Sequence, residues 1–200
     1  MRIHSFLLVS AALLVQGAAH AQNSDFAVLL GVTWPEGKIV SGPGTYVKGS
    51  VGGDIQFNYA FQAVQRVVDL YVEFPMVIAG RDTGLTTAGM VSESAGVDFY
   101  FTPGVRLKFS PESRVSLYGA AGGGLASLGQ LNVLTTNRSV TLSTGRVTTG
   151  AFDFGGGFDL RITRLLSFRI EGRDFVTRAG LGGSAGMHHG LVNFGIAFHF

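Results

Sequence analysis

The 200-residue chain contains no cysteine, five prolines and only 14% charged residues, although 46% of it is hydrophobic. Without cysteine no disulfide can form, so an exported form of this chain depends on its fold alone. Lysines are few and the formal net charge is +2, so no basic run is available to neutralise a phosphate backbone, and nucleic acid is not an expected partner. After Ala21 no apolar run approaches the length of a transmembrane helix, so any membrane contact must use strands or a surface.

The first 21 residues have the organisation of a secretory signal peptide. Arg2 forms a basic start, residues 6–15 are apolar, and Ala19 and Ala21 flank His20 in the small-residue pattern of a cleavage site. The apolar stretch is too short to cross a bilayer as a helix, which favours cleavage after Ala21 over a membrane-anchored helix. The sequence therefore predicts export and one mature domain over residues 22–200.

Large apolar residues alternate with small or polar ones along most of the mature chain. In the closing segment LVNFGIAFHF the apolar positions are Val192, Phe194, Ile196, Phe198 and Phe200. A period of two is typical of a strand with two unlike faces. The same pattern, in places weaker, occurs in residues 26–34, 47–61, 68–76, 97–109, 115–125, 152–160 and 166–173. The chain is thus predicted to be all-β, with about eight strands.

The connections between these strands alternate in length. They are tight near residues 62–65, 110–114 and 161–164, and long and rich in Gly, Ser and Thr at 35–45, 79–96, 129–146 and 177–190. Short turns at one end and long loops at the other are typical of an antiparallel up-and-down transmembrane β-barrel, with the short turns in the periplasm. An even strand number places both chain ends on the periplasmic side.

Alternation alone leaves the orientation of the two faces open, because a soluble eight-stranded barrel such as a lipocalin has the same period with its apolar face inward. Two features favour an orientation in which the apolar face is on the outside and contacts lipid. The polar faces contain much Gly, Ser and Ala instead of the mixed charge of a water-facing exterior. Aromatic residues such as Trp34, Tyr59, Phe109 and Phe200 lie near strand ends, as in the aromatic girdles of lipid-facing barrels.

Charged residues of both signs occupy the polar face, and they form a third argument for a narrow lumen. In a dry interior such groups are costly unless paired, so we expect them to pair across the barrel. The alternative is that they are scattered, solvated charges. The predicted lumen charge network comprises Asp54, Asp69, Glu73, Asp98, Arg106, Lys108, Asp153, Asp159, Arg169, Glu171 and Arg173.

In its alternating strands, its connections and these charged residues, the chain resembles the family of small eight-stranded outer-membrane β-barrels typified by the OmpA transmembrane domain and OmpX. The most specific element is Phe200 preceded by Phe198, Ile196, Phe194 and Val192, which is similar to the terminal signal that the barrel-assembly machinery recognises in that family. The resemblance implies a monomer in the bacterial outer membrane that contacts the assembly machinery, outer-membrane lipids and lipopolysaccharide. Unlike full-length OmpA, the chain stops at Phe200, so no periplasmic domain is expected.

No catalytic, metal or cofactor site is predicted. His188 and His189 fall in the last long connection, and adjacent residues of an extended chain point apart, which disfavours a shared metal. Their context, MHHGLVN, lacks the H-x-S motif of the outer-membrane lipid A deacylases, and the two glycine triplets match no phosphate-binding loop. The sequence favours a structural, adhesive or receptor-like role carried by long external loops. The alternatives are a narrow channel for small or hydrophobic solutes, similar to OmpW-type barrels, and, less favoured, a lipid A-modifying enzyme.

Overall fold

The computed structural model describes residues 24–35, 38–39, 45–49, 51–87, 90–111, 113–136, 139–178 and 187–200. The predicted signal peptide lies outside these residues. They form one antiparallel sheet of eleven strands: β1 (Ser24–Pro35), β2 (Lys38–Ile39), β3 (Thr45–Gly49), β4 (Gly52–Val64), β5 (Val68–Thr87), β6 (Met90–Phe101), β7 (Gly104–Phe109), β8 (Val115–Thr136), β9 (Ser139–Arg161), β10 (Leu166–Thr177) and β11 (Met187–His199). Among the described residues, no helix is long and apolar enough to cross a membrane.

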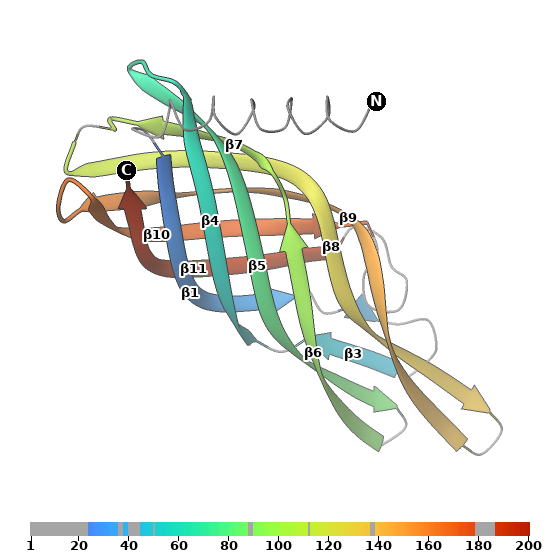
Figure 1. Cartoon of the computed structure of the whole chain (residues 1–200). Helices are drawn as coiled ribbons and strands as arrows, with labels where there is room; N and C mark the ends of the chain where they lie inside the picture. Colours follow the sequence, from blue (N-terminus) through green and yellow to red (C-terminus); the bar gives the residue numbers. More distant parts are fainter. Residues whose placement is uncertain are drawn as a thin grey trace, which may run out of the picture.

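The sheet closes into a ring of eight strand positions (Figure 1). β1 pairs with β4 on one side and with β11 on the other, so Phe26 lies opposite Phe198 and Trp34 lies opposite Gly190. At the end of the seam, Ser24 N donates to Phe200 O at 2.8 Å and Phe200 N donates to Ser24 O at 2.9 Å. The predicted up-and-down barrel, and its closure by the first and last strands, are confirmed. Closure removes the exposed sheet edges around the ring.

Two segments predicted as single strands are each divided in two. The 47–61 segment contains β3, which pairs with residues 83–87 of β5, and β4, which pairs with β1 in the ring. The 97–109 segment is interrupted at Thr102 and Pro103, but β6 and β7 on either side both pair with β5 and β8, so together they fill one ring position. Proline has no backbone N–H to donate. Pro103 O instead accepts from Gly123 N at 3.0 Å across this interruption.

Most of the residues predicted as long loops are paired strands, which corrects that part of the sequence analysis. β5 continues to Thr87 before β6 begins at Met90, and β8 continues to Thr136 before β9 begins at Ser139. The pairs run without interruption to Thr87 with Met90 and to Thr136 with Ser139, and β-branched Thr and Val, which are frequent here, favour strands. Figure 1 shows both hairpins reaching far beyond the end of the ring. These segments have the polar composition of turns, but pairing with a neighbouring strand stabilises them as strands.

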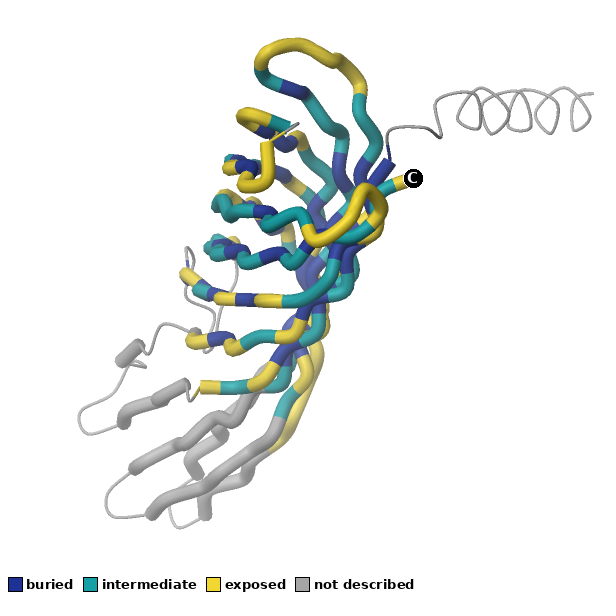
Figure 2. Tube along the Cα trace, turned by 90° about the vertical axis from the view of Figure 1, so that its left-hand side faces the viewer, coloured by how far each residue is buried: buried dark blue, intermediate teal, exposed yellow. Residues whose placement is uncertain are grey.

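The two faces of the wall have inverted polarity relative to a soluble protein. Outward Leu30 and Phe194 are 55% and 54% exposed, whereas inward Glu73 and Arg169 are both 0% exposed. Figure 2 shows buried and exposed positions alternating along the strands. A closed ring with apolar residues outside and buried polar residues inside is the arrangement expected of a lipid-facing barrel. The lipid-outside orientation therefore holds, and the soluble lipocalin-like alternative does not.

Candidate functional site: the filled lumen

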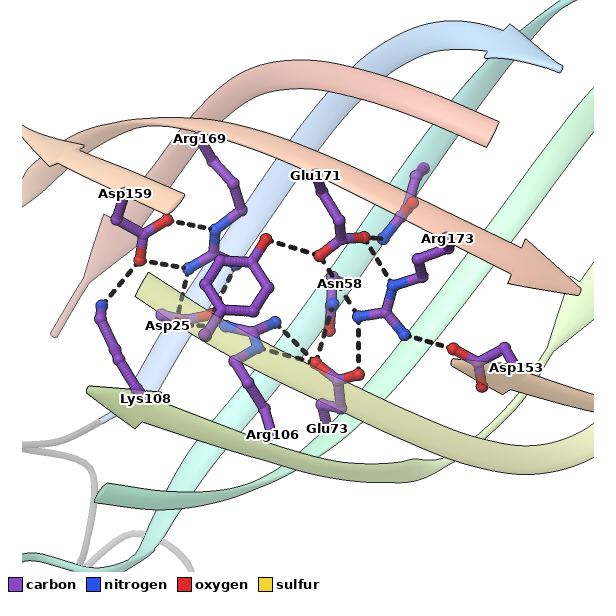
Figure 3. Close-up of polar contacts among 12 residues, drawn as sticks. Asp25, Asn58, Glu73, Arg106, Lys108, Asp153, Asp159, Arg169, Glu171 and Arg173 are labelled. Atoms are coloured by element: carbon purple, nitrogen blue, oxygen red, sulfur yellow. Dashed lines mark hydrogen bonds and ion pairs between the residues drawn. The ribbon is translucent and has the colours of Figure 1, made fainter. Parts of the chain in front are cut away.

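A group of nine charged side chains crosses the lumen, and we call it the lumenal ion cluster. It consists of the carboxylates Asp25, Glu73, Asp153, Asp159 and Glu171 and the cations Arg106, Lys108, Arg169 and Arg173, each no more than 4% exposed. Figure 3 shows these side chains converging from different strands of the wall. In an eight-stranded barrel the interior is just wide enough for side chains to fill. The cluster therefore occupies the cross-section at its level.

One half of the lumenal ion cluster is an alternating chain that ends at Arg106. Lys108 Nζ lies 2.7 Å from Asp159 Oδ2, and Arg169 Nε donates to Asp159 Oδ1 at 2.6 Å. Arg169 Nη2 is 3.1 Å from Asp25 Oδ2, which also lies 3.0 Å from Arg106 Nη1. Each carboxylate in this half bridges two cations. Buried charges are tolerated when their remaining polar atoms find such partners.

The other half continues from Arg106 to Arg173. Arg106 Nε donates to Glu73 Oε2 at 2.8 Å, and Arg173 Nη2 donates to Glu73 Oε1 at 2.6 Å. Arg173 also donates through Nη1 to Asp153 Oδ2 at 2.5 Å and through Nε to Glu171 Oε1 at 2.6 Å. One guanidinium therefore holds three carboxylates, which uses the fixed fork geometry of arginine that lysine lacks. Arg173 is the most connected cation of the cluster.

Tyr118 completes the cluster as an aromatic spacer. Its ring centre lies 4.8 Å from the Arg106 guanidinium carbon and 5.3 Å from that of Arg169, so it contacts two like charges. Its hydroxyl donates to Glu171 Oε2 at 2.7 Å. Gly157 lies between Tyr118 and Glu171 in the strand register, and a Cβ at Gly157 would stand 2.7 Å from the tyrosine hydroxyl. The missing side chain at Gly157 is what lets the ring reach across β9.

Amide side chains extend the polar network toward the remaining strands. Gln56 Nε2 donates to Glu171 Oε1 at 2.7 Å, and Asn58 Nδ2 donates to Glu73 Oε2 at 3.3 Å. Asn193 Nδ2 donates to Asp54 Oδ1 at 2.7 Å and to Gln56 Oε1 at 3.1 Å. All eight ring positions contribute a polar side chain to this network: Asp25, Gln56, Glu73, Arg106, Tyr118, Asp159, Arg169 and Asn193. The lumen is thus cross-linked around its whole circumference.

All eleven residues of the predicted lumen charge network are buried, but three of them lie outside the lumenal ion cluster. Asp54 bonds to Asn193, Asp69 accepts from the backbone N of Arg66 at 3.0 Å, and Asp98 accepts from the backbone N of Gly129 at 2.9 Å. Each of these three aspartates accepts a hydrogen bond from an amide side chain or a backbone N–H group.

The sequence analysis missed Asp25 and Tyr118. A signal for each existed in the alternation: Asp25 shares the inward positions of β1 with Ala27 and Leu29, and Tyr118 lies on the face opposite Leu117. Asp25 precedes Phe26, the first apolar residue of its predicted segment, and Tyr118 lies in a glycine-rich segment whose alternation is weak. Their central places in the lumenal ion cluster follow only from the assembled barrel.

A second, apolar layer fills the lumen above the cluster, toward the long-hairpin end. Phe175 follows Arg173 at the next inward position of β10, and its ring centre lies 4.8 Å from that of Tyr100. Its neighbours form one buried group, Val77, Ala79, Tyr100, Ala126, Leu128, Ala151, Phe175 and Leu191. His189 packs against Tyr100 with ring centres 5.7 Å apart. The lumen therefore carries two packed layers in series, the second of which the sequence analysis did not predict.

The two loop histidines of the sequence analysis lie in β11 and point to opposite sides of the wall, as expected for neighbours in an extended chain. His189 is 1% exposed and lies in the lumen, whereas His188 is outward. The predicted assembly signal is also in this last stretch of chain, where Val192, Phe194, Phe198 and Phe200 are 42% to 54% exposed on the outer surface. Ile196 shares this face, partly covered.

Solved structures with the same fold are outer-membrane barrels. OprG from Pseudomonas aeruginosa superposes with a TM-score of 0.66 and 9% identity over 90% of this chain and 97% of its own. Neisserial surface protein A superposes with a TM-score of 0.52 and 10% identity over 88% of this chain and 96% of its own. No protein-family model and no curated protein matches the sequence. The fold is that of the small outer-membrane β-barrels.

The chain is accordingly an outer-membrane β-barrel protein. The wall itself independently indicates a membrane-embedded barrel, because the exposed apolar band requires lipid around it and a closed ring satisfies its backbone hydrogen bonds internally. The β5–β6 and β8–β9 hairpins lie at the end of the barrel opposite the Ser24–Phe200 end of the seam.

Proposed function

We propose that this protein is a non-conducting barrel that anchors surface-exposed β-hairpins with a structural, adhesive or receptor-like role. The observation that carries the proposal is the lumenal ion cluster, whose alternating charges run from Lys108 through Arg169 and Arg106 to Arg173 without a break. To conduct, such a barrel would have to break several buried ion pairs at once, each costly to leave half-paired.

The apolar layer supports the same function. A hydrated path along the axis would have to pass Phe175 and Leu191 in addition to the charged residues, and these side chains are 0% and 2% exposed. Side chains packed in the lumen stabilise the barrel wall and leave no open path along the barrel axis. The parts of the molecule left to contact other molecules are then the hairpins and the outer surface.

Conductance of the refolded protein in planar bilayers tests the closed lumen. We expect no stable unitary currents from the wild type, and currents only from a variant that opens both packed layers, with Arg106, Arg173, Phe175 and Leu191 all replaced by alanine. Arg114→Ala, at an exposed position, is the matched control and should remain silent. Stable unitary currents from the wild type would refute the proposal and favour the narrow channel.

A shortened hairpin tests the surface role. Asn132 and Ser143 are paired partners in β8 and β9, so an Asn-Gly turn in place of residues 133–142 can close the hairpin four pairs lower. We expect this variant to retain heat-modifiable migration and to reduce the adherence of expressing cells to matrix-coated plates. Unchanged adherence of the shortened variant, or equal adherence of cells lacking the protein, would remove this hairpin from the proposed role.

We propose no enzymatic activity. Ser167 and His199 have the types of side chain that can act as nucleophile and general base, and Ser167 Oγ lies 2.8 Å from His199 Nε2. Ser167 is only 1% exposed, however, and a nucleophile must reach the substrate. Mass spectrometry of lipid A from cells with and without the protein tests this, and the two spectra should be identical.

A further inference from the structure

A groove of about 600 Å³ interrupts the outer wall toward the long-hairpin end. Its sides are Trp34 on β1 and Phe154 on β9, which are 45% and 46% exposed. Between them lie Gly190 on β11 and Gly172 on β10. Trp34, Gly190 and Phe154 all occupy outward positions of their strands, so the groove opens toward the surrounding membrane and not into the lumen.

The strand register explains why the wall is hollow here. Trp34 lies opposite Gly190, Gly190 opposite Asp174, and Asp174 opposite Phe154, so these four residues form one row across four adjacent strands. A Cβ at Gly190 would stand 2.4 Å from Trp34 Nε1, so the indole lies directly over this glycine. At a strand spacing of about 4.8 Å, the two aromatic sides are about 14 Å apart along the wall. The glycines keep the floor between them low.

Asp174 and His188 place a polar pair at this groove, on the outward face. His188 Nδ1 lies 2.6 Å from Asp174 Oδ2, with the side chains 53% and 27% exposed respectively. Asp174 Oδ1 is covered and makes no hydrogen bond with the described residues. Ionisable groups on a lipid-facing wall are costly and mark functional sites. The other ion pairs among the described side chains lie in the lumen, where the cluster accounts for them.

We propose that this groove binds one glycolipid of the outer leaflet, with acyl chains over the Gly172 floor and an amide or hydroxyl group of its acylated amino sugar at His188. Trp34 supports this placement, because tryptophan in such barrels lies at headgroup level, and Asp174 is in the same row. Arg173 is the cation among the lining residues, but its guanidinium is held by three carboxylates of the lumenal ion cluster, so the groove presents no charged donor to a lipid phosphate. Amide and hydroxyl groups both donate and accept hydrogen bonds, which suits a paired histidine and carboxylate.

Trp34 is the only tryptophan of the chain, so its fluorescence reports on this groove. The wild-type protein is reconstituted in vesicles of brominated phosphatidylcholine, which quench it, and unbrominated lipids are then added in increasing mole fraction. We expect lipid A to relieve quenching at a mole fraction about tenfold lower than unbrominated phosphatidylcholine, a preference of hydrogen-bond size. Relief in simple proportion to mole fraction for every lipid would show that no site exists. Selective relief by phosphatidylethanolamine or phosphatidylglycerol, but not by lipid A, would overturn the glycolipid assignment.

Three variants locate the site. Gly172→Leu fills the floor without strain, because the nearest atoms to a Cβ there are 3.9 and 4.0 Å away. Gly119→Leu is its matched control: Gly119 lies in the same outward row, two strands from Gly172, where the nearest atom is 3.9 Å from a Cβ. His188→Ala and Gly172→Leu should abolish the lipid A preference, whereas Gly119→Leu should keep it.

Heat-modifiable migration and far-UV circular dichroism establish that each variant is folded before it is compared. A lipid A preference that survives in folded His188→Ala and Gly172→Leu would refute this location. The inference concerns the outer wall alone, so conductance of the lumen, which would refute the proposed function, leaves it standing.

Discussion

Replacing Arg173 by methionine, a side chain of similar length without charge, is the most direct test of the lumenal ion cluster. Glu73 keeps Arg106, and Glu171 keeps Tyr118 and Gln56, so these two carboxylates retain donors. Asp153 has no other ion pair among the described residues. Breaking a buried pair costs about 3–5 kcal/mol because it leaves an uncompensated charge. We expect a loss of this size, a large part of a total stability of about 5–15 kcal/mol.

Replacing Asp153, the carboxylate that loses its cation, tests whether the unpaired charge causes this loss of stability. In the variant Arg173→Met, a second change of Asp153→Asn removes the stranded charge, so the double variant should regain about 1–3 kcal/mol. Urea unfolding of the barrel folded in phosphocholine vesicles, followed by Trp34 fluorescence and by heat-modifiable migration, measures all four proteins of this double-mutant cycle.

An exposed arginine provides the control. Arg114→Met should change the free energy of unfolding by less than about 0.5 kcal/mol, as surface substitutions usually do. A loss below about 1 kcal/mol for Arg173→Met, or effects of the two lumen substitutions that simply add, would show that these charges are hydrated individually and do not form a coupled cluster.

Three further predictions concern Tyr118, the lumen glycine Gly157 and the chain end. Tyr118→Phe removes a 2.7 Å hydrogen bond to the Glu171 carboxylate and should cost about 1.5–3 kcal/mol in the same unfolding assay. Gly157→Ala places a methyl group 2.2 Å from a backbone carbonyl oxygen and should cost about 1–3 kcal/mol, whereas Gly150→Ala, with no atom within 4 Å, should be neutral; equal effects would contradict the close packing. Deleting Phe200 should lower the yield of folded barrel in the outer membrane of expressing cells, and an unchanged yield would argue against the assembly signal.

The alternation of residue types was sufficient to predict which side of each strand is buried. Arg169 and Glu171 are separated by one residue, so any strand containing them turns both to the same face. The pairing of the first and last strands also followed, because an even-stranded barrel has to join its ends. Strand facing is a property of one strand, and closure is a property of the whole ring. Neither depends on how far neighbouring strands are shifted relative to one another.

Strand extent was harder to predict than strand face. Residues 79–96 and 129–146 have the polar composition of loops, yet they continue β5, β6, β8 and β9 as paired hairpins. Backbone pairing with a neighbour stabilises such segments whatever their alternation, and that pairing is not written in either strand alone.

What the amino-acid order determined by itself is the two-faced strand, since successive side chains point to opposite sides of any extended backbone. What only the folded barrel decided is which side chains meet across it. Asp25 and Arg169, far apart in the chain, lie 3.1 Å apart, and Asp174 and His188 meet on the outer wall. Contacts of this kind depend on the tilt and stagger of all eight ring strands together, which set the height of every residue on the wall.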